Sequence, residues 1–231
     1  MINIRRILLV SSLFTVFFIT EGMGQKINQF DQNGKRTGIW KKTYENGTVR
    51  YTGQFKNGKE VGVFKFYSRT APKIPAAIKE YTVANDTAKV SFFNGTGKLT
   101  SKGFLLGKKR VGKWTFYAAD GRKVSEEQYR DGQLDGPTVI FYPNGKVTEK
   151  TFYKAGQKHG NSKIYTDAGV LLEDVNYRNG KLDGKGTYYN LKGQLKERGN
   201  YKEGKRIGKW EFYMDGELSK KKKERLSDYG K

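Results

Sequence analysis

The chain has 231 residues, and its 45 Lys and Arg against 23 Asp and Glu give a formal net charge of +22. It has no Cys and one His, which excludes disulfide frameworks, thiolate metal sites, Cys nucleophiles and most His-based chemistry. We therefore expect neither a metal nor a cofactor. With 29 Gly, 15 Tyr and 14 Phe, the composition directs attention first to internal repeats.

The N-terminus has the pattern of a secretory signal peptide. Arg5 and Arg6 precede an uncharged apolar run over residues 7–20, which is shorter than the roughly 20 residues of a membrane span. Gly22 and Gly24 stand at the −3 and −1 positions of a cut after Gly24. We expect residues 1–24 to be removed, with export to a periplasm or the extracellular space, possible attachment to the envelope and no membrane span in the mature chain. An uncleaved N-terminal anchor is the alternative.

Repeats fill the rest of the chain. Aligned on a residue that precedes an aromatic-rich stretch, the units begin at Gly38, Gly62, Ala88, Gly112, Gly136, Gly160, Gly184 and Gly208. The starts are 24 residues apart, except that the second unit has 26 residues. Pro72 and Pro75 interrupt that unit, which indicates a loop insertion.

Aromatic residues recur at fixed offsets within the unit. Two and four residues after the start stand Trp40, Phe64, Phe66, Trp114, Phe116, Trp210 and Phe212. A spacing of two places both positions on one face of a strand. Thr138, Ser162 and Gly186 take the first of these positions in three units. A second alternating stretch ends at Tyr129, Tyr153, Tyr177 and Tyr201.

Glycines mark two turns in each unit. Nine residues after the start lie Gly47, Gly121, Gly145, Gly169 and Gly193, and twenty after it lie Gly58, Gly132, Gly156, Gly180 and Gly204. Several follow Asn or Asp, as hairpin turns with positive φ require. Each unit thus reads as strand, turn, strand, turn. Connections this short join only antiparallel neighbours, so we predict an all-β, elongated antiparallel meander over 25–216, followed by a charged tail over 217–231.

Three segments resemble the MORN-repeat variant found in many bacterial proteins. They are residues 112–117 (GKWTFY), 129–132 (YRDG) and 208–213 (GKWEFY). The resemblance implies an elongated β-hairpin array that binds or scaffolds other molecules. Some proteins with this repeat are antitoxins of toxin–antitoxin systems, so an antitoxin role is a further implication.

Catalytic motifs are absent from the sequence. His159 occupies the position that holds Asp135 and Asp183 in neighbouring units, and we interpret all three as turn residues. No Ser lies in a G-x-S-x-G context and no phosphate-binding G-x-x-x-x-G-K-[ST] loop is present. We predict a protein that is not an enzyme.

Surface charge is the remaining functional feature. Basic residues near the turns, which would form a stripe along one edge if successive turns stack, are Lys59, Lys108, Lys109, Arg110, Lys181, Lys205 and Arg206. We expect an exported, non-catalytic module that scaffolds or binds a protein partner at the cell envelope. Two alternatives stay open: an antitoxin or immunity protein that neutralises a toxin, and a basic surface for anionic lipid headgroups or envelope polymers. Nucleic acid is not expected, because an exported protein rarely meets it.

Overall fold

The structure, a computed structural model, describes residues 26–81 and 86–219, and it contains strands and no helix there. The expected signal peptide and nearly all of the charged tail lie outside this part. The strands are β1 (Gln29–Phe30), β2 (Arg36–Thr43), β3 (Val49–Lys56), β4 (Lys59–Tyr67), β5 (Pro75–Tyr81), β6 (Thr87–Phe93), β7 (Leu99–Leu106), β8 (Lys109–Tyr117), β9 (Lys123–Arg130), β10 (Gln133–Phe141), β11 (Val147–Lys154), β12 (Gln157–Tyr165), β13 (Leu171–Arg178), β14 (Lys181–Tyr189), β15 (Leu195–Lys202), β16 (Lys205–Met214) and β17 (Glu217–Leu218).

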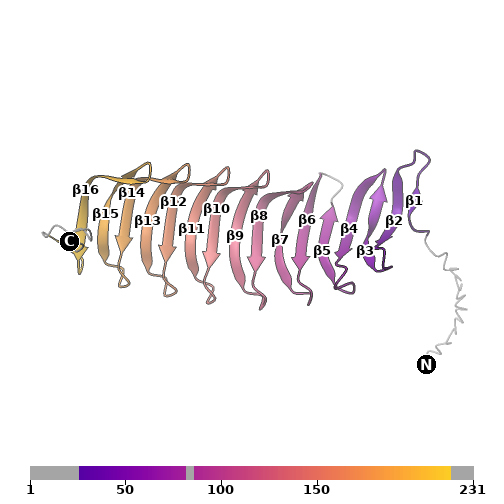
Figure 1. Cartoon of the computed structure of the whole chain (residues 1–231), viewed down its shortest axis with the longest axis horizontal. Coiled ribbons are helices and arrows are strands. Elements are labelled where there is room, and N and C mark those ends of the chain that lie inside the picture. Colours follow the sequence, from indigo (N-terminus) through magenta and orange to yellow (C-terminus); the bar gives the residue numbers. More distant parts are fainter. Residues whose placement is uncertain (1–25, 82–85, 220–231) are drawn as a thin grey trace, which may run out of the picture.

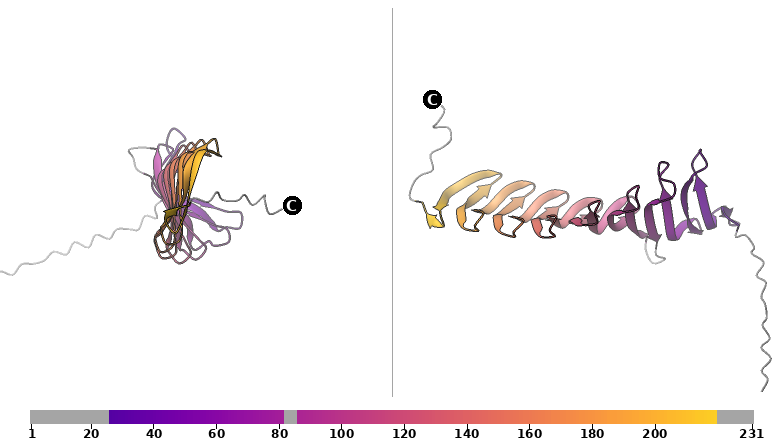
Figure 2. Two further views of the ribbon diagram at one scale, coloured as in Figure 1. Left: turned by 90° about the vertical axis from the view of Figure 1, so that its left-hand side faces the viewer. Right: turned by 90° about the horizontal axis from the view of Figure 1, so that it is seen from below.

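Each strand pairs antiparallel with the next one in the chain, so the strands form one open sheet. The strands run across the long axis of the molecule, and the array extends from β1 to β17 (Figure 1). Figure 2 shows a single layer that twists along this axis. The predicted all-β meander is confirmed. None of the described segments forms a helix with the length and hydropathy of a membrane span.

The two edges of the sheet carry different turns. At one edge, two-residue turns such as Asn57–Gly58 and Asp131–Gly132 have positive φ at both positions, as hairpin twist demands. At the other edge, five-residue connections such as 142–146 contain a Gly with positive φ. All ten turn glycines named from the sequence have φ between 78° and 92°. In the 26-residue unit, β4 and β5 are joined by seven residues, 68–74.

The glycines that begin seven of the eight units lie inside strands. Gly112, for example, belongs to β8 and has a φ of 64°, beside a register shift between β7 and β8. Such a β-bulge needs a residue that tolerates a left-handed backbone. Close by, the N–H of Gly132 donates to the carbonyl oxygen of Arg110 at 2.9 Å. Equivalent bonds recur in four other units, so each of these two-residue turns is hydrogen-bonded to the first strand of its own unit.

Candidate interaction surface

One face of the sheet, which we call the aromatic face, carries the Trp, Phe and Tyr rows named from the sequence. At the N-terminal end, Trp40, Phe55 and Phe64 are buried, and Tyr51, Phe66 and Tyr81 pack against them. A second cluster joins Val90, Leu105 and Trp114 to Phe92, Phe116 and Tyr129. Trp114 and Phe64 are fully buried. The core is therefore a series of local clusters, as expected for a repeat array in which neighbours stabilise each other.

Each of three aromatic rings, two of them fully buried, lies directly over a glycine of the preceding strand. An added Cβ at Gly103 would stand 2.5 Å from Cε2 of Trp114, and Gly53 and Gly199 are equally close to Phe64 and Trp210. None of these three glycines has a positive φ. They are glycines because the ring needs the space, and the sequence interpretation missed them. The signal was available, since each stands eleven residues before a Trp or Phe.

Where the ring is missing, the opposite residue is larger. Thr138, Ser162 and Gly186 are paired with Glu127, Thr151 and Val175. Thr151 and Ser162 are each 1 % exposed and their hydroxyl oxygens are 2.5 Å apart. In the middle of the aromatic face, smaller side chains such as Thr151, Ser162 and Val175 therefore take the place of the Trp rings.

Charged groups join the tyrosines over this middle section. Lys158 Nζ lies 3.3 Å from a carboxylate oxygen of Glu149 and 5.2 Å from the centre of the Tyr177 ring. Burial raises the pKa of Glu173, Lys158 opposes the rise, and the nearby Glu149 adds to it. Tyr129, Tyr153 and Tyr177 are each partly exposed. This section combines aromatic surface with both signs of charge.

Two residues of the predicted basic stripe belong to the aromatic face instead. Arg110 has its guanidinium carbon 4.7 Å from the centre of the Trp114 ring and donates to the hydroxyl of Tyr129 at 3.2 Å. Arg206 lies 3.9 Å from the Trp210 ring and is paired with Glu197 at 3.1 Å. Arg36 lies over Trp40 in the same way, at 4.9 Å. The sequence R-x-G-x-W thus places a cation on a ring of the same strand, across the bulge.

The other predicted stripe residues line the edge of two-residue turns. Lys59, Lys109, Lys181 and Lys205 are first residues of strands, and Lys108 stands within a turn. Their charges are largely paired: Lys59 with Asp86 at 3.7 Å, Lys109 with Asp131 at 3.9 Å and Lys181 with Glu203 at 2.9 Å. Over these turns the edge of the sheet therefore carries basic and acidic side chains side by side, and not a continuous row of positive charge.

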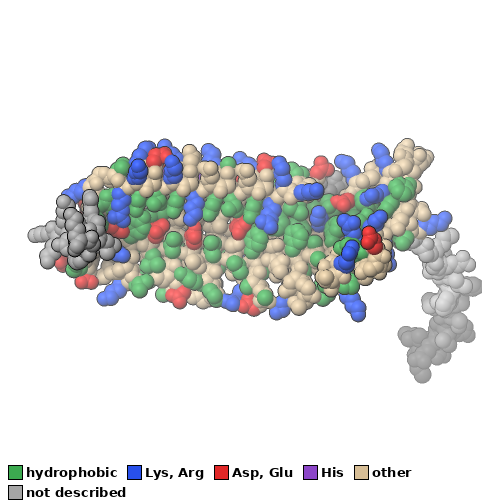
Figure 3. Space-filling model, in the orientation of Figure 1, with side chains coloured by type: hydrophobic (Ala, Val, Ile, Leu, Met, Phe, Trp, Pro, Cys, Tyr) green, Lys and Arg blue, Asp and Glu red, His purple; other side chains and the backbone are tan. Residues whose placement is uncertain are grey.

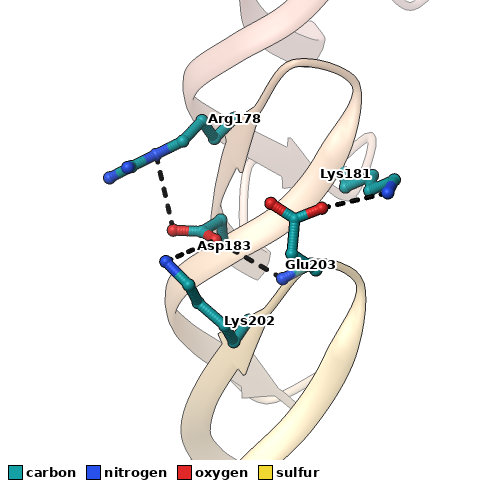
Figure 4. Close-up of polar contacts among 5 residues, drawn as sticks. All are labelled: Arg178, Lys181, Asp183, Lys202 and Glu203. Atoms are coloured by element: carbon teal, nitrogen blue, oxygen red, sulfur yellow. Dashed lines mark hydrogen bonds and ion pairs between the residues drawn. The ribbon is translucent and has the colours of Figure 1, made fainter.

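The acidic residues interpreted as turn residues lie in strands and support the next turn. Figure 4 shows Asp183 of β14 between Arg178 and Lys202, at 3.5 Å and 3.4 Å, while the N–H of Glu203 donates to its carboxylate at 3.4 Å. Desolvation raises the pKa of Asp183, but this hydrogen bond and the two cations outweigh it and the net pKa is lowered. Asp135 of β10 accepts from the N–H of Ala155 at 3.4 Å in the same way.

His159 lies in β12 and is partly exposed, so its placement in a turn was wrong. Over the described ranges, no three His, Asp or Glu side chains are grouped so that they could hold a metal ion.

The opposite face, which we call the back face, has an aromatic row that the sequence interpretation missed. Five residues after the unit start stand Tyr67, Phe93, Tyr117, Phe141, Tyr165, Tyr189 and Tyr213, all partly exposed. Cations lie over several of them, as Lys123 lies 4.8 Å from the Phe141 ring. Their 24-residue spacing was the available signal. Figure 3 shows one face of the sheet, on which hydrophobic side chains run along the molecule among Lys, Arg, Asp and Glu.

Comparison with protein families places this geometry among known repeats. The MORN repeat variant matches residues 36–57, 134–155, 158–179 and 182–203. Each match covers one hairpin, from the start of its first strand to the turn that follows its second strand. Repeats of this kind generally take part in binding proteins or membrane lipids, and the all-β repeat fold is typically non-catalytic. A comparison with curated proteins returned no match.

Proposed function

We propose that the chain is a non-catalytic interaction or scaffolding module that binds a protein partner along its aromatic face. The observation that carries this proposal is the single-layer sheet: over the described residues no second layer covers either face. A sheet ordinarily buries one face against another element, and here the partly exposed Tyr129, Tyr153 and Tyr177 remain at the surface. A partner with its own apolar surface would complete this layer.

The test is capture of partners from cell fractions by the full chain, with elution at low and then high salt. We expect one stoichiometric protein that is retained through high salt, because contacts to tyrosine rings are only weakly screened. Tyr177→Ser should weaken its retention, whereas the matched variant Tyr189→Ser on the back face should not. Recovery of no stoichiometric protein would contradict the proposal.

We further propose that the protein is exported and acts at the cell envelope, on the basis of its N-terminal sequence. Mass spectrometry of the protein from its native host should find a chain that begins at Gln25. A mature protein that retains residues 1–24 in a cytoplasmic fraction would refute export. If the captured partner is a toxin whose activity the chain suppresses, the binding role takes the form of immunity.

Binding to anionic headgroups or envelope polymers is a second candidate, favoured by the net charge of +22. The edge of two-residue turns is a poor site for such binding, because the charges of its lysines are already neutralised by neighbouring acids. Material of this kind would be recovered without fixed stoichiometry and lost as salt rises.

A further inference from the structure

The back face of β2, β3 and β4 carries basic side chains without acidic partners. Lys41 of β2 and Lys65 of β4 are both in register with Thr52 of β3. Because neighbouring strands lie about 4.8 Å apart, the two lysine Cα atoms are separated by roughly 10 Å across Thr52. Arg50 stands two residues before Thr52 and therefore on the same face. All three cations are exposed, and none forms an ion pair within the described residues.

Two guanidinium groups meet at one tyrosine beside these lysines. The hydroxyl of Tyr44 donates to the carbonyl oxygen of Tyr67 at 2.8 Å, which holds the ring in place. The guanidinium carbons of Arg69 and Arg50 lie 5.3 Å and 5.9 Å from the centre of that ring. Arg69 comes from the seven-residue connection of the 26-residue unit, so this grouping occurs once in the array. Stacked on a ring, each planar group keeps N–H donors free for a carboxylate.

The same positions of one later unit contain the missing acid. Lys163 occupies the place of Lys41 in its unit, and its cross-strand neighbour is Asp174, 3.3 Å away between charged atoms. In the first unit that neighbour is Thr52. Charge on the back face is thus neutralised within the later unit and left open in the first one.

Apolar side chains accompany the cations. Val63, which is 51 % exposed, and Ile39 precede Lys65 and Lys41 by two residues and share their face. A polymer of phosphate or sulfate groups would pair with the cations and leave these side chains in water. An acidic protein segment that also carries apolar residues would cover both.

We infer that the N-terminal back face, formed by Ile39, Lys41, Arg50, Val63, Lys65 and Arg69, docks an acidic segment of a protein partner in which carboxylates alternate with apolar side chains. This inference rests on the proposed function, since it names a surface and a chemistry for the protein partner. It places that contact on the opposite side of the sheet from the aromatic face.

The experiment measures binding of a fluorescein-labelled 12-residue peptide of alternating Glu and Leu to the full chain at physiological salt. Neutralising two cations with Lys41→Gln and Lys65→Gln should weaken binding about fivefold to tenfold, because two carboxylates lose their partners. The matched control, Lys109→Gln and Lys181→Gln, removes the same charge from paired edge lysines and should change binding less than about twofold. Circular dichroism checks that both variants keep the fold.

Two further probes separate the possible occupants. Polyglutamate of equal charge should bind more weakly than the peptide, and Val63→Ser should weaken only the peptide. Equal loss of peptide binding in the two double variants would overturn the inference, because it would show attraction to net charge alone. Tighter binding to phosphatidylglycerol vesicles than to the peptide, sensitive to Lys41 and Lys65, would overturn it in favour of a lipid surface.

The captured partner distinguishes this inference from the proposed function. If a stoichiometric protein is retained by the chain and remains bound to the variant with Lys41→Gln and Lys65→Gln, the proposed function stands and the inference fails. Loss of that protein in this variant and not in the Lys109 and Lys181 control supports both.

Discussion

Replacing Gly103 by Ala adds one methyl group beneath the Trp114 ring. The new Cβ would stand 2.5 Å from Cε2, whereas ordinary contacts between such atoms begin at 3.4 Å. The ring would have to move by at least about 0.9 Å, and it is fully buried, with neighbours on both sides. The backbone of Gly103 itself accepts a side chain, because its φ is not positive. Any loss of stability therefore reports the steric conflict alone.

Overpacking of this kind costs about 1–3 kcal/mol. In a chain of this size, 1 kcal/mol corresponds to roughly 2–4 °C in Tm for cooperative unfolding. Removing the ring with Trp114→Ala should by itself cost about 3–5 kcal/mol, as other truncations of large core residues do. In that background Gly103→Ala should cost nothing, because the methyl group then fills part of the cavity.

The assay is urea unfolding, followed by circular dichroism, of wild type, the two single variants and the double variant. Gly95→Ala is the matched control, since Gly95 has no positive φ and a Cβ added there would meet no atom within 4 Å. It should be neutral or stabilise the fold by about 0.4–1 kcal/mol. If Gly103→Ala unfolds at the same urea concentration as Gly95→Ala, the ring does not lie on Gly103 and the proposed packing is wrong.

Three further substitutions test the edge and the polar section. Asp183→Asn should lower the free energy of unfolding at neutral pH and leave it equal to that of wild type in strong acid. The reason is that the lowered pKa of Asp183 stabilises the fold until the pH falls through that pKa. Urea unfolding at several pH values measures this, and a loss that does not depend on pH would contradict it. Glu173→Gln should raise the Tm at neutral pH, and the gain should vanish in acid. The raised pKa of Glu173 means that its charged form is unfavourable in the folded protein. A lower Tm of the variant at neutral pH would show instead that the attraction between Glu173 and Lys158 dominates. Gly132→Ala should cost about 1–3 kcal/mol in the same assay, because its φ of 86° is strained for Ala, and a change no larger than that of Gly95→Ala would count against this reason.

The sequence predicts the architecture well because the strand pairing is local. A 24-residue period with turn glycines leaves short connections, and short connections permit only antiparallel neighbours. The aromatic rows at Trp114 and Phe116 identify the packed face for the same reason, since alternation along a strand is geometric.

The details of the edge and the bulge could not be predicted in this way. Gly112 marks the period in the sequence, but only the backbone shows that it is a bulge within β8 and that Arg110 folds over the following Trp. The placement of Lys59 and Lys181 against acids of neighbouring turns depends on how turns stack, which the period alone does not specify. Gly103 was predictable in principle, because it faces the Trp position of the next unit.

In each hairpin, the last strand pairs a residue with the first strand of the next hairpin, and a large side chain on one side needs a small residue on the other. This steric requirement determines which units can be neighbours in the array. Removing residues 160–183 would bring Thr151 opposite Gly186, two residues that fit together without conflict. Removing residues 184–207 would instead bring Val175 beneath Trp210, where the present array has Gly199. A shortened protein of the first kind should fold with its ends about 10 Å closer, since each unit contributes two strands. The length of the array can therefore be changed by whole units only where the residues that become cross-strand neighbours fit together sterically.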